Sequence, residues 1–195
     1  ISSSYYVDDI EFCDDGYLYA VTDEVVYKID PSTMNIADFY GPSGYLLLGI
    51  GSQDGSSYVY ACGNSRVFRL LRSSMVRYNS WISTGDVIYD VIHAPGNIVF
   101  FCGEPAAVYK TTSTFGSEVT YNLNGDGRCL TFADGYLFVG DESGDVTKID
   151  PSNMSYVDHY DYFRGIYSIC YGADGYLYAG VVHDGDILKI DPSDM

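Results

Sequence analysis

Short apolar segments alternate with turns made of Gly, Asp, Ser and Pro along the whole chain. One pattern, Asp15-Gly16-Tyr17-Leu18-Tyr19-Ala20, returns almost unchanged at residues 134–139 and 174–179. The motif Lys-Ile-Asp-Pro-Ser-x-Met follows each copy, at residues 28–34, 148–154 and 189–195. With weaker copies around Arg69 and Lys110, a basic residue falls at 28, 69, 110, 148 and 189, at intervals of 41, 41, 38 and 41 residues. This spacing predicts an internal repeat of about 40 residues.

Each repeat contains four short segments that favour β-strands. The first is apolar with small residues, at Val7–Phe12, Tyr45–Gly51, Val87–His93, Arg128–Phe132 and Gly165–Tyr171. A turn, usually Asp-Gly, leads to the second, because Gly readily takes the positive φ of a tight hairpin. An Asp-Pro-Ser turn separates the third from the fourth, which lies at Asn35–Tyr40, Val76–Trp81 and Ser155–Tyr160. No stretch has the 3.6-residue period of an amphipathic helix, so the sequence predicts an all-β fold.

Four strands repeated about every 40 residues are typical of the blades of a β-propeller. The sequence therefore predicts a five-bladed β-propeller with four antiparallel strands in each blade. We expect one domain over residues 1–195, with repeats at approximately 1–34, 35–75, 76–116, 117–154 and 155–195.

The two ends of the chain suggest how the ring closes. The chain ends at Met195, where the fourth strand of the last repeat would begin, and it starts with a segment that resembles such a strand: Ile1, Ser2, Ser3, Ser4, Tyr5 and Tyr6. We expect this N-terminal strand to close the last blade, which removes exposed strand edges. Two alternatives remain. The chain is a segment of a longer array, or its N-terminal strand completes a blade of a neighbouring copy and builds a head-to-tail polymer.

The string Asp-Gly-Tyr-Leu-Tyr-Ala-Gly, followed by Gly-Asp-x-x-Lys-Ile-Asp-Pro-Ser, resembles the repeats of quinoprotein-like and YVTN/NHL-type propellers. The resemblance covers the whole chain and implies the propeller fold. It implies no single function, because those families include enzymes, sensors and scaffolds. The Trp-Asp pair of WD40 blades and the Trp-rich docking motif of quinoprotein dehydrogenases are both absent, since Trp81 is the only Trp. We therefore expect no quinone and no other cofactor.

The charge of the chain limits its partners. With 27 acidic and 10 basic residues, the net charge of −17 argues against nucleic acid and anionic membranes as partners. No apolar run approaches 18 residues, so we expect no membrane insertion. The first residue is Ile and not Met, which fits processing of an exported protein and also fits a fragment. Together with a glycosylation acceptor at Asn153-Met154-Ser155, this favours an extracellular or cell-surface location.

The function that we favour from the sequence is that of a non-enzymatic structural or interaction propeller that assembles with itself into a filament or surface layer. Repeats two and three support a protein partner, because four of the six Arg fall within twelve residues there. With Trp81 they form a candidate interaction patch for an acidic partner: Arg66, Arg69, Arg72, Arg77 and Trp81. The alternative is that each Arg pairs with a nearby carboxylate of its own chain.

Two other functions are open. A lectin-like propeller would use the 21 Tyr as platforms for glycans, with repetition giving avidity, although the consensus Tyr side chains also suit the core of the fold. A glycoside hydrolase needs carboxylates that converge from different blades. Its inner-strand candidates are Asp8, Asp9, Asp86, Asp90 and Asp126. Because the loops are too short to build a pocket around them, we expect no enzyme.

Metal and thiol chemistry are weakly indicated. Asn122, Asn124 and Asp126 partly match a calcium loop, but Ala133 stands where a bidentate carboxylate is required, so we expect an ordinary turn. The five Cys include no CxxC pair, which argues against structural zinc. Cys62 and Cys102 occupy the same small apolar position in adjacent repeats, and we expect both to be buried free thiols.

Overall fold

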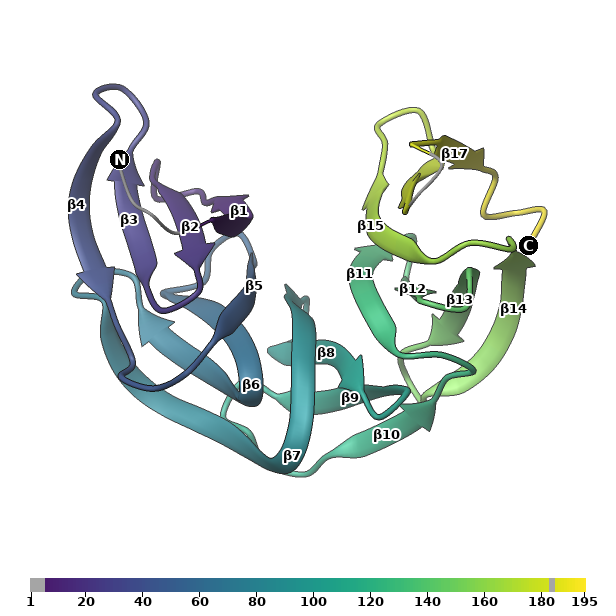
Figure 1. Cartoon of the computed structure of the whole chain (residues 1–195), viewed down its shortest axis with the longest axis horizontal. Coiled ribbons are helices and arrows are strands. Elements are labelled where there is room, and N and C mark those ends of the chain that lie inside the picture. Colours follow the sequence, from purple (N-terminus) through teal and green to yellow (C-terminus); the bar gives the residue numbers. More distant parts are fainter. Residues whose placement is uncertain (1–5, 183–184) are drawn as a thin grey trace.

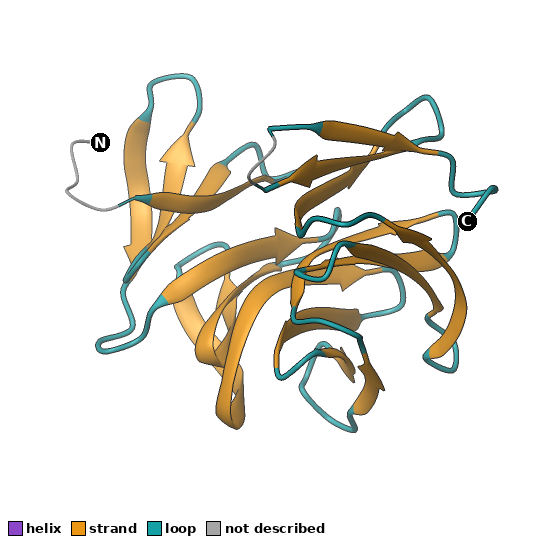
Figure 2. Cartoon of the chain, turned by 45° about the vertical axis from the view of Figure 1, so that its right-hand side comes forward, coloured by secondary structure: helices purple, strands orange, loops and turns teal. Residues whose placement is uncertain are grey.

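The computed structural model describes residues 6–182 and 185–195, and this part of the chain contains strands and turns without a helix. Figure 2 shows the strands joined by short loops. In chain order the strands are β1 (Val7–Phe12), β2 (Leu18–Thr22), β3 (Val26–Asp30), β4 (Asn35–Tyr40), β5 (Leu47–Ser52), β6 (Tyr58–Leu71), β7 (Val76–Ala94), β8 (Ile98–Glu104), β9 (Ala107–Thr112), β10 (Val119–Asn122), β11 (Gly127–Ala133), β12 (Tyr136–Asp141), β13 (Asp145–Asp150), β14 (Ser155–Asp161), β15 (Ile166–Tyr171), β16 (Leu177–Val181) and β17 (Ile187–Ile190).

The strands form antiparallel sheets. Their orders are β1-β2-β3-β4, β10-β9-β8-β7-β6-β5, β11-β12-β13-β14 and β15-β16-β17. Figure 1 shows these sheets side by side in an open arc, with β1–β4 at one end and β15–β17 at the other. In each sheet the first strand of the repeat lies toward the centre of the arc and later strands lie farther out. The all-β prediction is therefore confirmed.

The six-stranded sheet differs from the separate four-stranded blades that the sequence predicted. Residues 59–63 of β6 pair with β5, whereas residues 66–71 pair with β7, with Ser65 at a φ of 56° between them. Residues 76–82 of β7 pair with β6 and residues 87–94 pair with β8. Two repeats are joined here because β7 runs without a break from the outer strand of one repeat into the inner strand of the next.

The last sheet has three strands in the described part of the chain. Its fourth strand was predicted from the N-terminal segment. Ile1, Ser2, Ser3, Ser4 and Tyr5 lie outside the described residues, and Tyr6 belongs to no strand and is exposed.

The motif Asp-Pro-Ser-x-Met builds the turn between the third and fourth strands. The Asp30 carboxylate accepts the Ser32 N–H at 2.8 Å, and Asp150 accepts the Ser152 N–H at the same distance. The Met then takes a left-handed conformation, with a φ of 57° at both Met34 and Met154. Each of these Met residues donates its N–H to the carbonyl of the motif's Asp, at 2.7 and 2.9 Å. The motif therefore has the spacing that a closed, hydrogen-bonded turn requires.

The apolar core lies between successive repeats. Tyr19 and Val21 of β2 pack with Leu47 of β5 and Phe68 of β6 in one cluster, and three similar clusters follow along the arc. Because side chains alternate across a strand, a repeat inside the arc contributes one face to the cluster before it and the other face to the cluster after it. Cys62 and Cys102 lie in two of these clusters and are fully buried, as predicted.

Candidate functional site

The inner strands share one irregularity that directs side chains into the centre of the arc. β1, β5, β7, β11 and β15 each have a register shift at the same place against their partner strand. A bulge of this kind turns the extra residue out of the regular alternation. The five residues in the bulges all line a central cavity of about 390 Å³: Asp8, Leu48, Tyr89, Arg128 and Tyr167.

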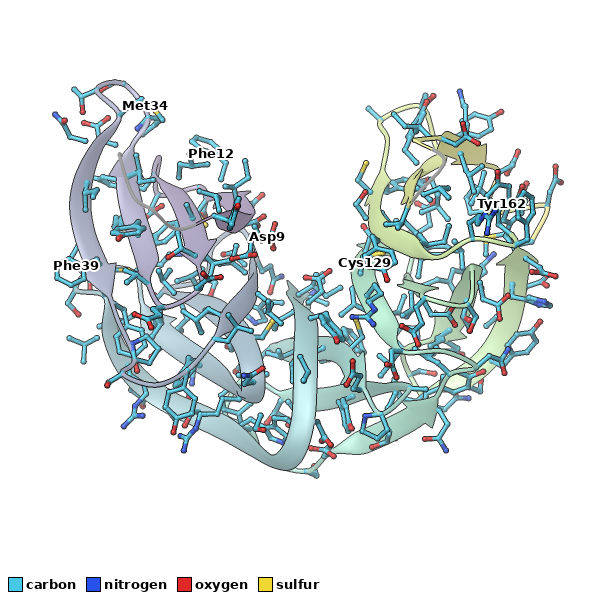
Figure 3. All side chains as sticks on the ribbon, in the orientation of Figure 1. Asp9, Phe12, Met34, Phe39, Cys129 and Tyr162 are labelled. Atoms are coloured by element: carbon cyan, nitrogen blue, oxygen red, sulfur yellow. The ribbon has the colours of Figure 1, made fainter. Side chains whose placement is uncertain are left out.

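Two carboxylates follow the bulge and tie neighbouring inner strands together. Asp9 accepts the N–H groups of Ile10 and Ile50 at 2.8 and 2.9 Å, one on each oxygen. Asp90 accepts those of Val91 and Leu130, both at 2.7 Å, in the same way. In Figure 3, Asp9 lies on the central side of β1. Burial, and after it the charge of Asp9, raises the pKa of Asp90 to about 7, and burial also raises the pKa of Asp9.

The structure brings together three of the five predicted hydrolase candidates. Asp8, Asp9 and Asp90 line the central cavity, whereas Asp86 and Asp126 do not. Asp86 accepts the hydroxyl of Tyr109 at 3.4 Å, and Asp126 lies 3.9 Å from Arg128. Since both oxygens of Asp9 and of Asp90 already accept backbone N–H groups, their observed role is to join strands.

Arg128 is the cation of the central cavity. Its guanidinium lies over the ring of Tyr89, 3.9 Å from the centroid, and donates to Glu142 at 2.6 Å. Glu104 stands 3.8 Å away. The positive charge is therefore held by acids and by an aromatic face. Sequence reasoning missed this residue because Arg128 lies outside the Arg-rich segment.

A second cavity, of about 410 Å³, lies at the other end of the inner strands. Its lining combines acids, an imidazole and aromatic rings: Glu11, Phe12, Cys13, Ser52, Gln53, Asp54, Ile92, His93, Ala94, Pro95, Thr131 and Phe132. Burial, followed by the charges of Arg69 and Arg72, lowers the pKa of His93 to about 4. Burial raises the pKa of Glu11 to about 7, with a further contribution from Asp9. Sequence reasoning missed His93, because its position is taken by Phe12, Ser52 and Phe132 in other repeats.

The five residues of the predicted interaction patch do not share one surface. Arg69 and Arg72 are buried, Arg66 and Trp81 are half-buried, and Arg77 is exposed. Arg66 lies over Tyr45 at 4.5 Å and Arg69 over Tyr58 at 3.6 Å. The Trp81 indole packs 4.5 Å from the Phe101 ring and donates to Glu118 at 2.6 Å.

Arg72 links the first two repeats. Its guanidinium binds Asp14 at 2.5 Å and also donates to Ser52 and to the carbonyl of Gln53. Its own carbonyl accepts the Lys28 ammonium at 2.8 Å. This Arg therefore holds the boundary between two sheets from both its side chain and its backbone.

The repeated basic position forms the same contact in several repeats. Lys28 also binds Asp15 at 3.0 Å, and Tyr19 donates to that carboxylate at 2.8 Å. Lys110 and Lys148 donate to the carbonyls of Pro151 and Pro192, which belong to the turn of the following repeat. In the last repeat Lys189 binds Asp174 at 2.9 Å and Tyr178 donates to Asp174 at 2.7 Å, with no carbonyl of a following repeat among the described residues.

The two end faces of the arc expose positions that are buried or half-buried in the other repeats. The residue two places before the basic position is 0% exposed as Val26, Val67, Val108 and Val146, but 76% exposed as Ile187. On the inner strands, Ile50, Val91 and Leu130 are at most 5% exposed, whereas Ile10 of β1 is 58% exposed. Val7 is exposed beside it. Elsewhere in the arc, two apolar faces from successive repeats bury each other. Each end of the arc exposes one such face without its partner, and we call this an exposed half-core.

The segment that partly matches a calcium loop is held by hydrogen bonds. Asn124 donates its side-chain amide to Asp145 at 2.9 Å, and the buried Asp141 carboxylate accepts the Gly125 N–H at 3.3 Å. Asn122 ends β10 and is exposed, and Asp126 faces Arg128. Within residues 6–182 and 185–195 no group of three or more His, Cys, Asp or Glu is placed to hold a metal ion. The same residues contain no helix long and apolar enough to cross a membrane.

Comparison with solved structures agrees with this geometry. The chain is similar to the β-propeller domain of Cps50 (Swd1) from Myceliophteria thermophila, with a TM-score of 0.77 and 14% identity over 90% of this chain and 62% of that one. It is also similar to a chain of the mitotic checkpoint complex, with a TM-score of 0.83 and 10% identity over 96% of this chain and 61% of that one. Both are WD40-type propellers, and at these identities the likeness concerns the fold.

The antiparallel sheets, arranged side by side with their inner strands around the central cavity, define the class: the chain has a β-propeller fold. It spans about three fifths of the length of the two solved chains. No family model and no curated protein matches the sequence. The propeller prediction is thereby confirmed at the level of the fold, and the likeness to quinoprotein, YVTN or NHL repeats stays a prediction.

Proposed function

We propose that this chain is a non-enzymatic interaction propeller of five blades, and that its partner is a second copy of the chain. The observation that carries the proposal is the pair of exposed half-cores at the two ends of the arc. The blade count rests on the five inner strands around the central cavity and on the double use of β6 and β7.

The two end faces complement each other, because each repeats a surface that is buried between blades elsewhere. Ile187 and Tyr178 stand where Val26 and Tyr19 face the next repeat, and Val7 and Ile10 stand where Leu47 and Ile50 face the previous one. A second copy that places its β1 face on the β15–β17 face therefore makes a contact for which four versions already exist in the chain. Exposed apolar patches of this kind are typical of interaction sites.

The shape of the arc decides what such an assembly looks like. The sheets take up most of a turn in Figure 1, so a second copy that continued in the same plane would collide with the first. The copies must be offset along the axis of the arc. A head-to-tail contact with such an offset does not close and builds an open helical filament.

Two finer points belong to the same proposal. The low basic content, the charge of −17 and the exposed Asn153 of an Asn-x-Ser sequence favour an extracellular or cell-surface location. The repeat motif favours a relationship with YVTN/NHL-type propellers. Glycosylation of Asn153 in the native protein, measured by mass spectrometry of its peptides, tests the location.

Sedimentation velocity over a range of protein concentrations tests self-association. The variants Val7→Asp and Ile187→Asp each damage one end face, and Val157→Asp places the same charge on an exposed Val of the outer strand β14. We expect the wild type and Val157→Asp to grow in mass with concentration, while each end-face variant alone stays monomeric. A mixture of the two end-face variants retains one intact face on each partner and should stop at a dimer.

Three results contradict the proposal. The wild type stays monomeric at every concentration, as it would if its own two ends met. All three Asp variants behave alike, in which case the charge and not the face matters. The mixed end-face variants grow beyond a dimer.

A further inference from the structure

The second cavity contains a buried side chain whose hydrogen-bonding groups are unused. His93 is only 7% exposed, yet neither ring nitrogen has a hydrogen-bond partner in the part of the chain that the structure describes. Its ring packs 5.0 Å from that of Tyr60 at a tilt, which fixes its place at the wall of the cavity. A buried polar group without a partner is energetically unfavourable, so a molecule that satisfies its hydrogen bonds gains affinity.

The protonation states of His93 and Glu11 determine which chemical groups the cavity can bind. With a pKa of about 4, His93 is neutral near pH 7, so one nitrogen donates and the other accepts. Glu11, with a pKa of about 7, is present both as an acid that donates and as a carboxylate that accepts. A hydroxyl group, which also donates and accepts, matches both side chains.

The other lining residues exclude charged ligands. No Lys or Arg is among the described residues that line the cavity, and Glu11 and Asp54 repel anions. Arg72, whose charge acts on both His93 and Glu11, is already bound to Asp14 and Ser52. A metal ion is disfavoured, because the lining has no three ligands suitably placed.

An aromatic face completes the cavity. Phe12, which is 64% exposed, and Phe132, which stacks on Phe100 at 6.3 Å, both line it. Figure 3 shows Phe12 at the end of the first sheet that faces the gap in the arc. An apolar platform next to a few convergent polar groups, in a space of 300–1,000 Å³, is the usual composition of a small-molecule site.

We propose that this cavity binds a neutral sugar residue, whose ring lies on Phe12 while its hydroxyls bond to His93 and Glu11. Phe12 follows Ile10 by two residues on β1, whose face is the proposed contact between copies, so sugar binding is measured at protein concentrations where the chain is monomeric.

The test is an array of immobilised neutral and charged glycans, followed by calorimetric titration of the best neutral glycan. We expect His93→Phe and Phe12→Ala each to weaken binding at least tenfold. The matched control is Phe39→Ala, because Phe39 is 62% exposed but lies on the outer strand of the same sheet, away from the cavity (Figure 3). It should bind like the wild type. His93→Phe keeps an aromatic ring against Tyr60, so thermal unfolding should show it to be folded.

Several outcomes would overturn the assignment. The array shows no glycan bound, or only charged glycans whose binding disappears in high salt. Alternatively, a neutral glycan binds, but His93→Phe and Phe12→Ala leave its affinity unchanged or Phe39→Ala weakens it as much.

Discussion

The carboxylate of Asp90 on β7 accepts the backbone N–H of Leu130 on β11, which belongs to another sheet, at 2.7 Å. The Asp9–Ile50 bond is its equivalent two repeats earlier in the fold, between β1 and β5. Side chains therefore hold adjacent inner strands together where no backbone ladder joins them. Both bonds use a carboxyl oxygen as acceptor, and burial raises the pKa of both carboxyl groups. The stability of the contacts between inner strands should therefore depend on pH.

Stability should fall as the pH rises from about 5 to about 7. The pKa of Asp90 is about 7 in the folded chain and near 4 when unfolded, so the folded state holds a proton that the unfolded state has lost. One such group changes the free energy of unfolding by up to about 1.4 kcal/mol per pH unit. Glu11, with its raised pKa, acts in the same direction, and His93 acts in the opposite one.

Asp90→Asn isolates the contribution of Asp90. The variant should lose about 1 kcal/mol near pH 5, because an amide nitrogen cannot accept one of the two N–H groups. It should also show a shallower fall of stability toward pH 7. Urea unfolding of both proteins across this range measures the difference. If both curves have the same slope, Asp90 does not titrate in this window.

Arg72→Ala should destabilise the protein by about 3 kcal/mol, because it leaves Asp14, Ser52 and the Gln53 carbonyl without a common partner at a buried boundary. Arg77→Ala removes an exposed Arg five residues away and should change stability by no more than about 0.5 kcal/mol. Denaturant midpoints of the two variants compare them directly. Equal losses would mean that the buried contacts of Arg72 add nothing.

Gly103→Ala should cost about 3 kcal/mol or prevent folding. A Cβ at Gly103 would overlap the carbonyl of Val87 and lie 3.0 Å from the Cα of Ile88, and neither backbone atom can move away independently. Gly41→Ala is the control, since its Cβ would find its nearest neighbours at 3.7 Å. Circular dichroism and thermal melting should show a near-native Gly41→Ala. A melting point for Gly103→Ala close to that of the control would contradict the close approach of β7 and β8.

The sequence predicted the repeat and most strand positions because both depend on local pattern. Asn35–Tyr40 was located to the residue, and Ser155–Asp161 and Gly127–Ala133 to within one or two at each end. The convergence of Asp8, Asp9 and Asp90 could not be read from their spacing. It depends on the bulges, which turn Asp8, Tyr89 and Arg128 inward and which leave no mark in the alternation of apolar residues.

The burial of the Arg side chains could not be predicted from the sequence either. Arg69 and Arg72 are buried because Tyr58 and Tyr78 cover one guanidinium and Asp14 holds the other. Tyr58 lies at the far end of β6, Tyr78 on β7 and Asp14 in the turn after β1. Charge clustering in sequence says how many Arg are near one another, but it does not say whether they face water. The fourth strand of the last sheet was assigned to residues 1–6 by analogy of composition, and it stays a prediction.

The repeated Lys contacts predict unequal effects of one substitution. Lys28→Met should destabilise by about 1.5–3 kcal/mol, because it removes bonds to Asp15 and to the Arg72 carbonyl. Lys189→Met removes the equivalent bond to Asp174. Because Lys189 has no bond to a carbonyl of a following repeat among the described residues, this substitution should destabilise the monomer less than Lys28→Met does. Unfolding at low protein concentration measures both. Equal losses would show that the contact to the next repeat contributes nothing.

Lys189, Asp174 and Tyr178 form the same triad in the last repeat as Lys28, Asp15 and Tyr19 form in the first. Ile187, two residues before Lys189, is nonetheless 76% exposed, so an apolar side chain stands beside this triad at the surface. In the proposed contact between copies, the net charge of −17 on each copy opposes association. Salt screens those charges over about 10 Å at 0.1 M while leaving apolar contacts in place. The proposed association should therefore strengthen as the ionic strength rises.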